Sequence, residues 1–352
     1  MGFFGVGATP ASTRVDGEAN VTVTTDASAP EHPSSPIPVQ GKPVGAGLRV
    51  PLGETGLKIF PLFLGGAEFG WHVDLAKAHR ILDAYVERGG NAVKTSDGYA
   101  AGRSEHIIGE WMARRAIRDE IVLGVRIGRH PDHPGLGSVN LIRSVEASLG
   151  RLKTDHLDVL YLDAGADSQS SLEDTLATAE WLVESGKVRS LGSIGHSAAQ
   201  LVEARILASA GYPRLTVLEV PYNVLRQNEF DSDLRLVAGA QGIAVTPSQA
   251  LEHGYLSGVH RSRAKVGSSV RGSQIAAAMN RRGARTLRAL DRIGAELSIP
   301  TGAVAIAWLL AQRAVVAPIV NVYAVEHVDE LVQGVGAKLS RAQLAEIAKA
   351  AQ

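Results

Sequence analysis

The chain alternates short apolar runs with longer amphipathic stretches from about residue 46 to its C-terminus. The apolar runs have the length and composition of strands and occupy residues 62–66, 91–95, 121–127, 157–163, 188–194, 216–222, 243–248 and 316–322. Stretches of helical period separate them, at residues 74–89, 103–117, 139–151, 171–186, 197–210, 232–241 and 301–312. Near-continuous apolar strands joined by helical crossovers are typical of a parallel sheet that helices cover on both faces.

Eight such units within about 300 residues favour a closed (β/α)8 TIM barrel over an open doubly wound sheet. An open dinucleotide-binding sheet would carry G-x-G-x-x-G between its first strand and a helix, whereas here the first run ends in LGGAEFG and enters a loop. Residues 48–62 predict an N-terminal β-hairpin with a glycine-containing turn. Capping-box patterns begin at Ser197 and Ser340 and predict the starts of two helices.

The first 45 residues differ from this body in kind. They are rich in Pro, Ser, Thr, Ala and Gly and show neither helical nor strand periodicity. Such a segment buries too little apolar surface to offset its ordering entropy. We therefore predict a disordered tail at 1–45 and a single barrel domain at 46–352.

Charge and cysteine content limit the classes of partner. The 36 basic residues balance 36 acidic ones, so the chain lacks the positive excess that a nucleic-acid binder needs. The chain contains no cysteine, which rules out disulfides, thiolate catalysis and thiolate metal sites and suits a reducing compartment. No apolar run reaches the roughly 18 residues of a membrane span. We expect a cytoplasmic protein with no nucleic-acid partner and no membrane insertion.

The chemistry of a (β/α)8 barrel lies at the carboxyl ends of its strands. Polar side chains predicted there are Glu68, Lys94, Tyr99, Arg126, Asp163, Glu219, Ser248, Gln249 and Tyr323, with His130, His133, His196 and His253 in the loops that follow. Such a cluster is either a functional site or an ion network that serves stability alone. Histidines in proline-containing loops are usually exposed, so we expect no metal site.

Residues 91–109 read NAVKTSDGYAAGRSEHIIG. This stretch resembles the second strand and loop of the aldo-keto reductase family, whose usual form is N-F-I-D-T-A-x-x-Y-G-x-x-x-S-E-x-x-I-G. The resemblance continues at 144–162, 183–197, 220–227 and 317–332, and so covers nearly everything from residue 46 onward. It implies a (β/α)8 barrel and NADPH-dependent reduction of an aldehyde or ketone.

The resemblance places four residues at the positions of the family's catalytic groups. Tyr99 falls on the proton-donating Tyr, Lys94 on an Asp, Arg126 on a Lys and Asp163 on a His. Three of the four positions are therefore replaced.

The resemblance also locates the cofactor positions. Glu219 stands where the family has Gln, and Ser248, followed by Gln249, stands where it has the Tyr on which the nicotinamide stacks. Ile194 and Gly195 replace a Ser-Asn pair, His327 takes the place of an Arg or Gln, and Glu330 is retained. NADPH is the implied cofactor, and the replaced anchors predict impaired binding.

Three hypotheses follow. In the first, NADPH-dependent carbonyl reduction is impaired or lost, and the barrel mouth binds a small-molecule ligand or runs another reaction. In the second, the chain is a working oxidoreductase with Tyr99 as acid, Arg126 as its activator and Asp163 protonated. In the third, it is a structural or regulatory barrel subunit that binds a partner protein. Lys94, Asp163 and Arg126 could instead form a structural ion triad. No residue indicates the oligomeric state.

Overall fold

The computed structural model describes residues 47–167, 169–230, 232–263, 266 and 271–352. The tail predicted at 1–45 lies outside these residues. The described chain starts with two short strands, β1 (Val50–Pro51) and β2 (Lys58–Ile59), which pair antiparallel and confirm the predicted hairpin. The amide of Leu52 donates to the carbonyl of Leu57 across the turn at 2.9 Å.

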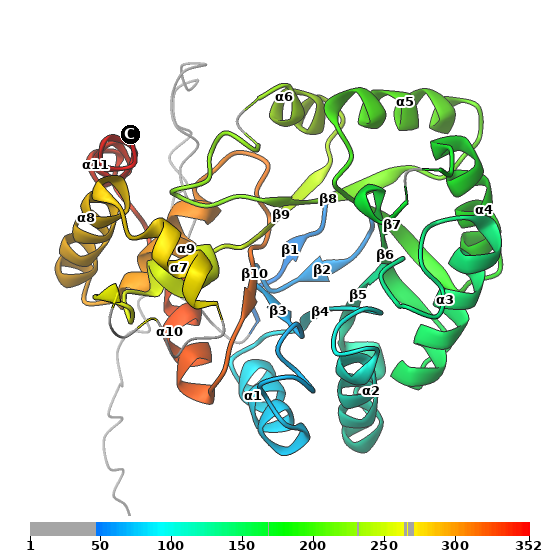
Figure 1. The fold of residues 1–352 in the computed structure, drawn as a ribbon, viewed down its shortest axis with the longest axis horizontal. Coiled ribbons are helices and arrows are strands. Elements are labelled where there is room, and N and C mark those ends of the chain that lie inside the picture. The colour runs from blue at the N-terminus through cyan, green and yellow to red at the C-terminus, as the bar shows by residue number, and fades with distance from the viewer. Residues whose placement is uncertain (1–46, 168, 231, 264–265, 267–270) are drawn as a thin grey trace, which may run out of the picture. The chain divides into compact units, whose positions relative to one another are not determined.

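Eight parallel strands form a ring, which confirms the predicted (β/α)8 barrel (Figure 1). In chain order they are β3 (Phe63–Gly65), β4 (Ala92–Ser96), β5 (Val122–Ile127), β6 (Leu157–Asp163), β7 (Val188–Ile194), β8 (Leu215–Pro221), β9 (Ala244–Ser248) and β10 (Ile319–Asn321). Sequence neighbours pair throughout, and β10 pairs with β3. Hydrogen bonds from Val245 to Ala314 and from Val316 to Val245, both 2.9 Å long, close the ring between β9 and the segment before β10.

Helices surround the ring. They are α1 (Leu75–Glu87), α2 (Arg103–Arg115), α3 (Ser138–Leu152), α4 (Leu172–Glu184), α5 (Ala198–Ser209), α6 (Asp233–Ala240), α7 (Gly272–Ala278), α8 (Arg281–Leu297), α9 (Thr301–Leu310), α10 (Val325–Gly336) and α11 (Arg341–Ala350). Both predicted capping boxes are present, at Ser197 and Ser340. The sequence interpretation lacked α8 as an element, because its arginines mask the buried stripe of Leu287, Leu290 and Ile293.

The interior of the barrel is filled by side chains from alternate strands, as in other barrels of this class. Tyr161 of β6 is fully buried and lies between two glycines of the neighbouring strands. A Cβ at Gly192 would approach the Tyr161 ring to 2.6 Å, and one at Gly124 to 2.9 Å. The two glycines therefore make room for a large ring below the barrel mouth.

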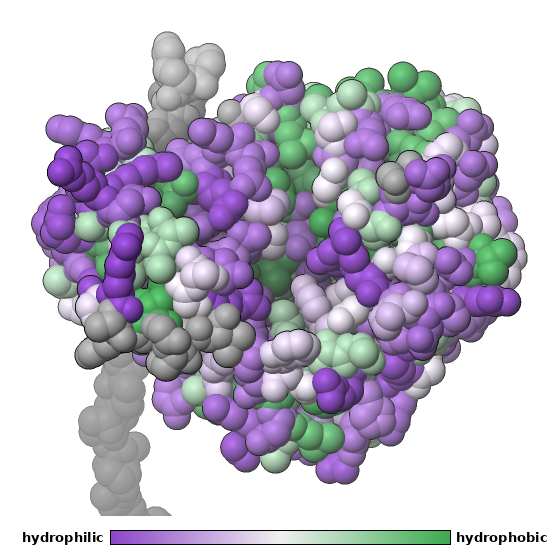
Figure 2. Space-filling view, viewed as in Figure 1, coloured by the Kyte–Doolittle hydropathy of each residue, from purple (hydrophilic) through white to green (hydrophobic). Residues whose placement is uncertain are grey.

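Apolar side chains on the outer face of the strands pack against the helices in one continuous core. Some apolar side chains remain at the surface, among them Ile206 of α5 and Leu236 of α6, which are 65% and 72% exposed. Figure 2 shows hydrophobic surface over these two helices. No single helix in the described residues is long and apolar enough to cross a membrane. The cytoplasmic location stays a prediction.

Candidate active site

The carboxyl ends of the strands surround a cavity of about 360 Å³. Its lining includes eight of the polar residues singled out in the sequence, namely Glu68, Tyr99, Arg126, Glu219, Ser248, Gln249, His253 and Tyr323. Figure 2 shows the corresponding hollow over the middle of the strand ring. The structure therefore brings together most of the predicted site, in the place where a barrel of this class carries its chemistry.

Lys94 lies below the cavity and forms a buried ion pair. Its ammonium group is 2.5 Å from a carboxylate oxygen of Glu219, and the two side chains are 2% and 9% exposed. The same ammonium group lies 4.8 Å from the centre of the Tyr161 ring. These three side chains come from β4, β8 and β6, the alternate strands that share an interior layer. A lysine so deeply buried needs such a counter-charge.

Asp163, at the end of β6, holds two arginines. One of its oxygens accepts hydrogen bonds from Nε of Arg126 at 2.8 Å and from Nε of Arg129 at 2.7 Å. Its other oxygen accepts from the backbone N–H of Gly165 at 2.9 Å. Burial alone would raise the pKa of Asp163, but the hydrogen bonds and charges of Arg129 and Arg126 outweigh it and lower the pKa. Asp163 is therefore ionised at neutral pH.

Arg126 also lies near Tyr99. Burial alone would lower the pKa of Arg126, but the negative charge of Asp163, followed by Tyr99, raises it. A permanently charged guanidinium group thus borders the hydroxyl that the resemblance marks as a proton donor.

A third cluster closes the opposite wall of the cavity. Arg271, in the segment after β9, lies 2.5 Å from a carboxylate oxygen of Glu68, in the loop after β3. His72 contacts the second oxygen at 2.7 Å. Burial alone would raise the pKa of Glu68, but these partners, together with Tyr323, lower it. The cluster ties together loops that are 203 residues apart in the chain.

A strained turn follows β9 and contributes to the cavity wall. Gln249, Glu252 and His253 have positive φ angles of 53°, 46° and 56°, which L-residues rarely adopt. Buried Glu252 fixes the turn, because its carboxylate accepts from Asn223 at 2.6 Å and from Arg226 at 2.8 Å. The side chains of Gln249 and His253 thereby border the cavity.

Two of the sequence interpretations are wrong. The triad of Lys94, Asp163 and Arg126 does not form, because Lys94 pairs with Glu219 and Asp163 pairs with Arg126 and Arg129. The protonated Asp163 required by the oxidoreductase hypothesis does not fit its two guanidinium partners, which donate to its carboxylate and lower its pKa. Both errors have one origin, since the sequence shows the charges at the mouth but not which of them face each other.

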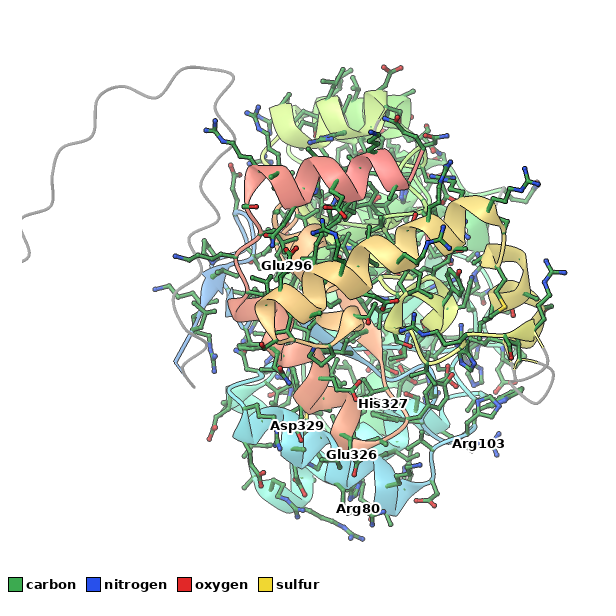
Figure 3. All side chains as sticks on the ribbon, turned by 90° about the vertical axis from the view of Figure 1, so that its left-hand side faces the viewer. Arg80, Arg103, Glu296, Glu326, His327 and Asp329 are labelled. Atoms are coloured by element: carbon green, nitrogen blue, oxygen red, sulfur yellow. The ribbon has the colours of Figure 1, made fainter. Side chains whose placement is uncertain are left out.

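The remaining predicted residues lie outside the cavity lining. His327 and Glu330 are on α10, where Nδ1 of His327 accepts from the backbone N–H of Tyr323 at 3.3 Å. Figure 3 labels His327 on this helix with its neighbours Glu326 and Asp329. Within the described residues, no group of three or more His, Asp or Glu side chains is arranged to hold a metal ion.

Sequence reasoning missed Arg129 and Arg271 as members of the site. Arg129 follows Arg126 by three residues, so it sits in the loop just above the end of β5. That position was a usable signal, because any side chain one turn beyond a barrel strand lies near the mouth. Arg271 belongs to a basic segment that follows β9, but residue spacing does not show which of its arginines reaches the site.

Known proteins are similar to this chain in sequence. A model of the aldo/keto reductase family matches residues 61–352. "Putative aryl-alcohol dehydrogenase AAD14" of Saccharomyces cerevisiae is 29% identical over 332 residues, which cover 88% of this chain and 87% of the relative. Norsolorinic acid reductase of Aspergillus flavus is 28% identical, with 85% and 79% covered. Aldo-keto reductase ausK of Emericella nidulans is 31% identical, with 82% and 78% covered. The chain belongs to the aldo/keto reductase family.

Proposed function

We propose that this chain is a ligand-binding member of the family in which NADPH-dependent carbonyl reduction is impaired or lost. The observation that carries the proposal is the pairing of the replaced residues. Lys94 with Glu219, and Arg126 with Asp163, form two ion pairs where the family has a proton-relay tetrad and an amide. The cavity above them stays open, so the mouth keeps room for a small molecule.

The replacements compensate one another. At these four positions the family has an Asp and a Lys of opposite charge and a neutral His and Gln. This chain has two cations, Lys94 and Arg126, and two carboxylates, Asp163 and Glu219. A buried Lys94 alone would be strongly destabilising, and so would a buried Glu219 alone. Their direct contact at 2.5 Å supports a site rebuilt as a unit.

Reduction of a carbonyl places negative charge on its oxygen, which needs hydrogen-bond donors aimed at it. The family's His supplies such a donor, whereas ionised Asp163 accepts hydrogen bonds only and repels that charge. The tyrosine of the family is also coupled to a Lys–Asp pair. Here Lys94 is turned to Glu219 and Arg126 to Asp163, so Tyr99 lacks the same relay.

The cavity residues fit the nicotinamide end of the cofactor poorly. A carboxamide both donates and accepts hydrogen bonds, and so do the Ser and Asn side chains that usually hold it. Ile194 and Gly195 have no polar side chain, and the carboxylate of Glu219 only accepts. Ser248 offers no aromatic ring for stacking.

A working oxidoreductase is the second candidate. Tyr99 and Arg126 line the same cavity, which favours this reading, and two of the relatives are named as reductases. In this reading Tyr99 donates the proton and Arg126 stabilises its phenolate.

Calorimetric titration of the protein with NADPH, with NADH for comparison, separates the two. The proposal predicts no heat of binding up to millimolar cofactor. A dissociation constant near or below about 1 μM, or roughly −8 kcal/mol, would favour the oxidoreductase, because such affinity requires intact anchors.

A further inference from the structure

We propose that Arg126 and Arg129 form a binding site for the carboxylate group of a small organic acid. The inference deepens the proposed function, because it rests on the barrel mouth being a ligand site. It concerns guanidinium N–H groups for which the part of the chain that the structure describes offers no acceptor.

Asp163 holds the two arginines side by side. Both guanidinium groups direct their Nε to the same carboxylate oxygen, at 2.8 Å and 2.7 Å. Gly165 permits this arrangement, since a Cβ there would lie 2.9 Å from Nη2 of Arg129. Like charges repel, and the shared carboxylate keeps the two cations at a fixed spacing.

Much of the donor capacity of the pair is left over. A guanidinium group has five N–H donors. Among the described residues, Nη1 of Arg126 and both Nη groups of Arg129 have no hydrogen-bond acceptor. The side chains are 23% and 41% exposed, against 3% for Asp163, so a ligand can reach them.

The charges also favour an anion. Two guanidinium groups share the single carboxylate of Asp163, so their N–H donors outnumber the acceptors in contact with them. Asp97 lies under the same loop, but its carboxylate accepts from the backbone N–H groups of Gly128 and Arg129. A guanidinium fork matches the oxygens of a carboxylate or a phosphate, and the apolar walls of the cavity favour the carboxylate of an organic acid.

A second cluster of the same composition shows what a purely structural arrangement looks like. Asp158, near the start of β6, pairs with Arg118 at 3.0 Å and Arg189 at 2.8 Å. The other N–H groups of Arg118 donate hydrogen bonds within the protein. Nε donates to Thr154, Nη1 to the carbonyl of Ile121 and Nη2 to the carbonyl of His156. Among the described residues, Arg126 and Arg129 lack the additional acceptors that Arg118 has, and Arg126 borders a cavity.

The cavity that Arg126 lines restricts the acid, and Arg129 is outside that lining. Its volume of about 360 Å³ suits a small molecule, and Ile194, Pro221 and Val320 give it apolar walls. We therefore expect a carboxylate on a compact apolar body. Benzoate is a suitable probe, and benzamide is its neutral isostere.

Calorimetric titration with benzoate, benzamide and inorganic phosphate tests the inference. The full-length protein should bind benzoate and not benzamide. Arg129→Gln should weaken benzoate binding about 10- to 100-fold, as expected for a lost charged hydrogen bond. Arg129→Lys, which keeps the charge without the fork, should lose less. Arg189→Gln is the matched control and should leave benzoate binding unchanged.

Several outcomes would overturn the inference: equal benzoate affinity in Arg129→Gln and wild type, equal binding of benzamide, or no binding of benzoate at millimolar concentration. Arginine-dependent binding of phosphate alone would exclude the carboxylate assignment. None of these results depends on NADPH. NADPH binding with turnover would refute the proposed function and leave the carboxylate site unaffected. Absence of benzoate binding would refute the carboxylate site and leave the proposed function unaffected.

Discussion

Replacement of Glu219 by Gln should sharply destabilise this protein, even though it restores the residue usual in the family. Lys94 is 2% exposed, and its ammonium group has the carboxylate of Glu219 at 2.5 Å as its counter-charge. Without that charge, the ammonium group keeps the Tyr161 ring at 4.8 Å, an interaction of about 0.5–2 kcal/mol. Breaking a buried ion pair by removing one partner costs about 3–5 kcal/mol. We expect a loss in that range from a typical total stability of about 5–15 kcal/mol.

Urea unfolding followed by circular dichroism measures this loss. The double variant Lys94→Met with Glu219→Gln removes both charges and should lie within about 2 kcal/mol of wild type. Glu146→Gln removes the partner of Lys187 in an exposed pair, whose side chains are 29% and 47% exposed, and should cost less than about 1 kcal/mol. A loss of stability for Glu219→Gln no greater than that for Glu146→Gln would refute the role of the buried ion pair.

Further predictions concern acid stability, the strained turn and a helix cap. The native pKa of Asp163 lies below its ordinary value of 3.8, so its contribution to stability is complete above that value and is lost as the pH falls through the native pKa. The difference in unfolding free energy between wild type and Asp163→Asn should therefore be smaller in urea titrations at about pH 3 than at about pH 7. Glu252→Gln should cost about 1–3 kcal/mol, because it weakens the fixation of the turn, and a cost no greater than that of exposed Glu229→Gln would contradict this role. Ser340→Ala should cost about 1 kcal/mol in thermal or urea unfolding, because the N-cap of α11 is lost, and an unchanged stability would contradict it.

Most of the barrel could be predicted from the sequence, because strand and helix periods differ and alternate regularly. The strand ends at Asp163 and Ser248 agree with the structure. The helices that follow β9 were harder to predict from the sequence. The apolar residues of α8 have the spacing of one helix face, but seven other residues of this helix are charged. A segment with so many charges is typical of a solvent-exposed surface, so the helix was not predicted.

The members of the site were predictable, but their pairing was not. Lys94, Arg126, Asp163 and Glu219 all stand near strand ends, and opposite charges can pair in several ways. The layers of side chains inside the barrel determine which charges pair, since Lys94 on β4 faces Glu219 on β8 across the barrel. Arg126 and Asp163, on neighbouring strands, meet at the rim. Loop residues such as Arg129 depend on a backbone path that residue spacing does not specify.

The most direct test of the account is steady-state oxidation of NADPH with a panel of aldehydes and ketones, for wild type and for Tyr99→Phe. The proposed function predicts that wild type shows no turnover beyond that of Tyr99→Phe, because paired charges stand where the family has its proton relay. Turnover that Tyr99→Phe abolishes, with its fold and stability unchanged, would contradict the account and establish a working reductase.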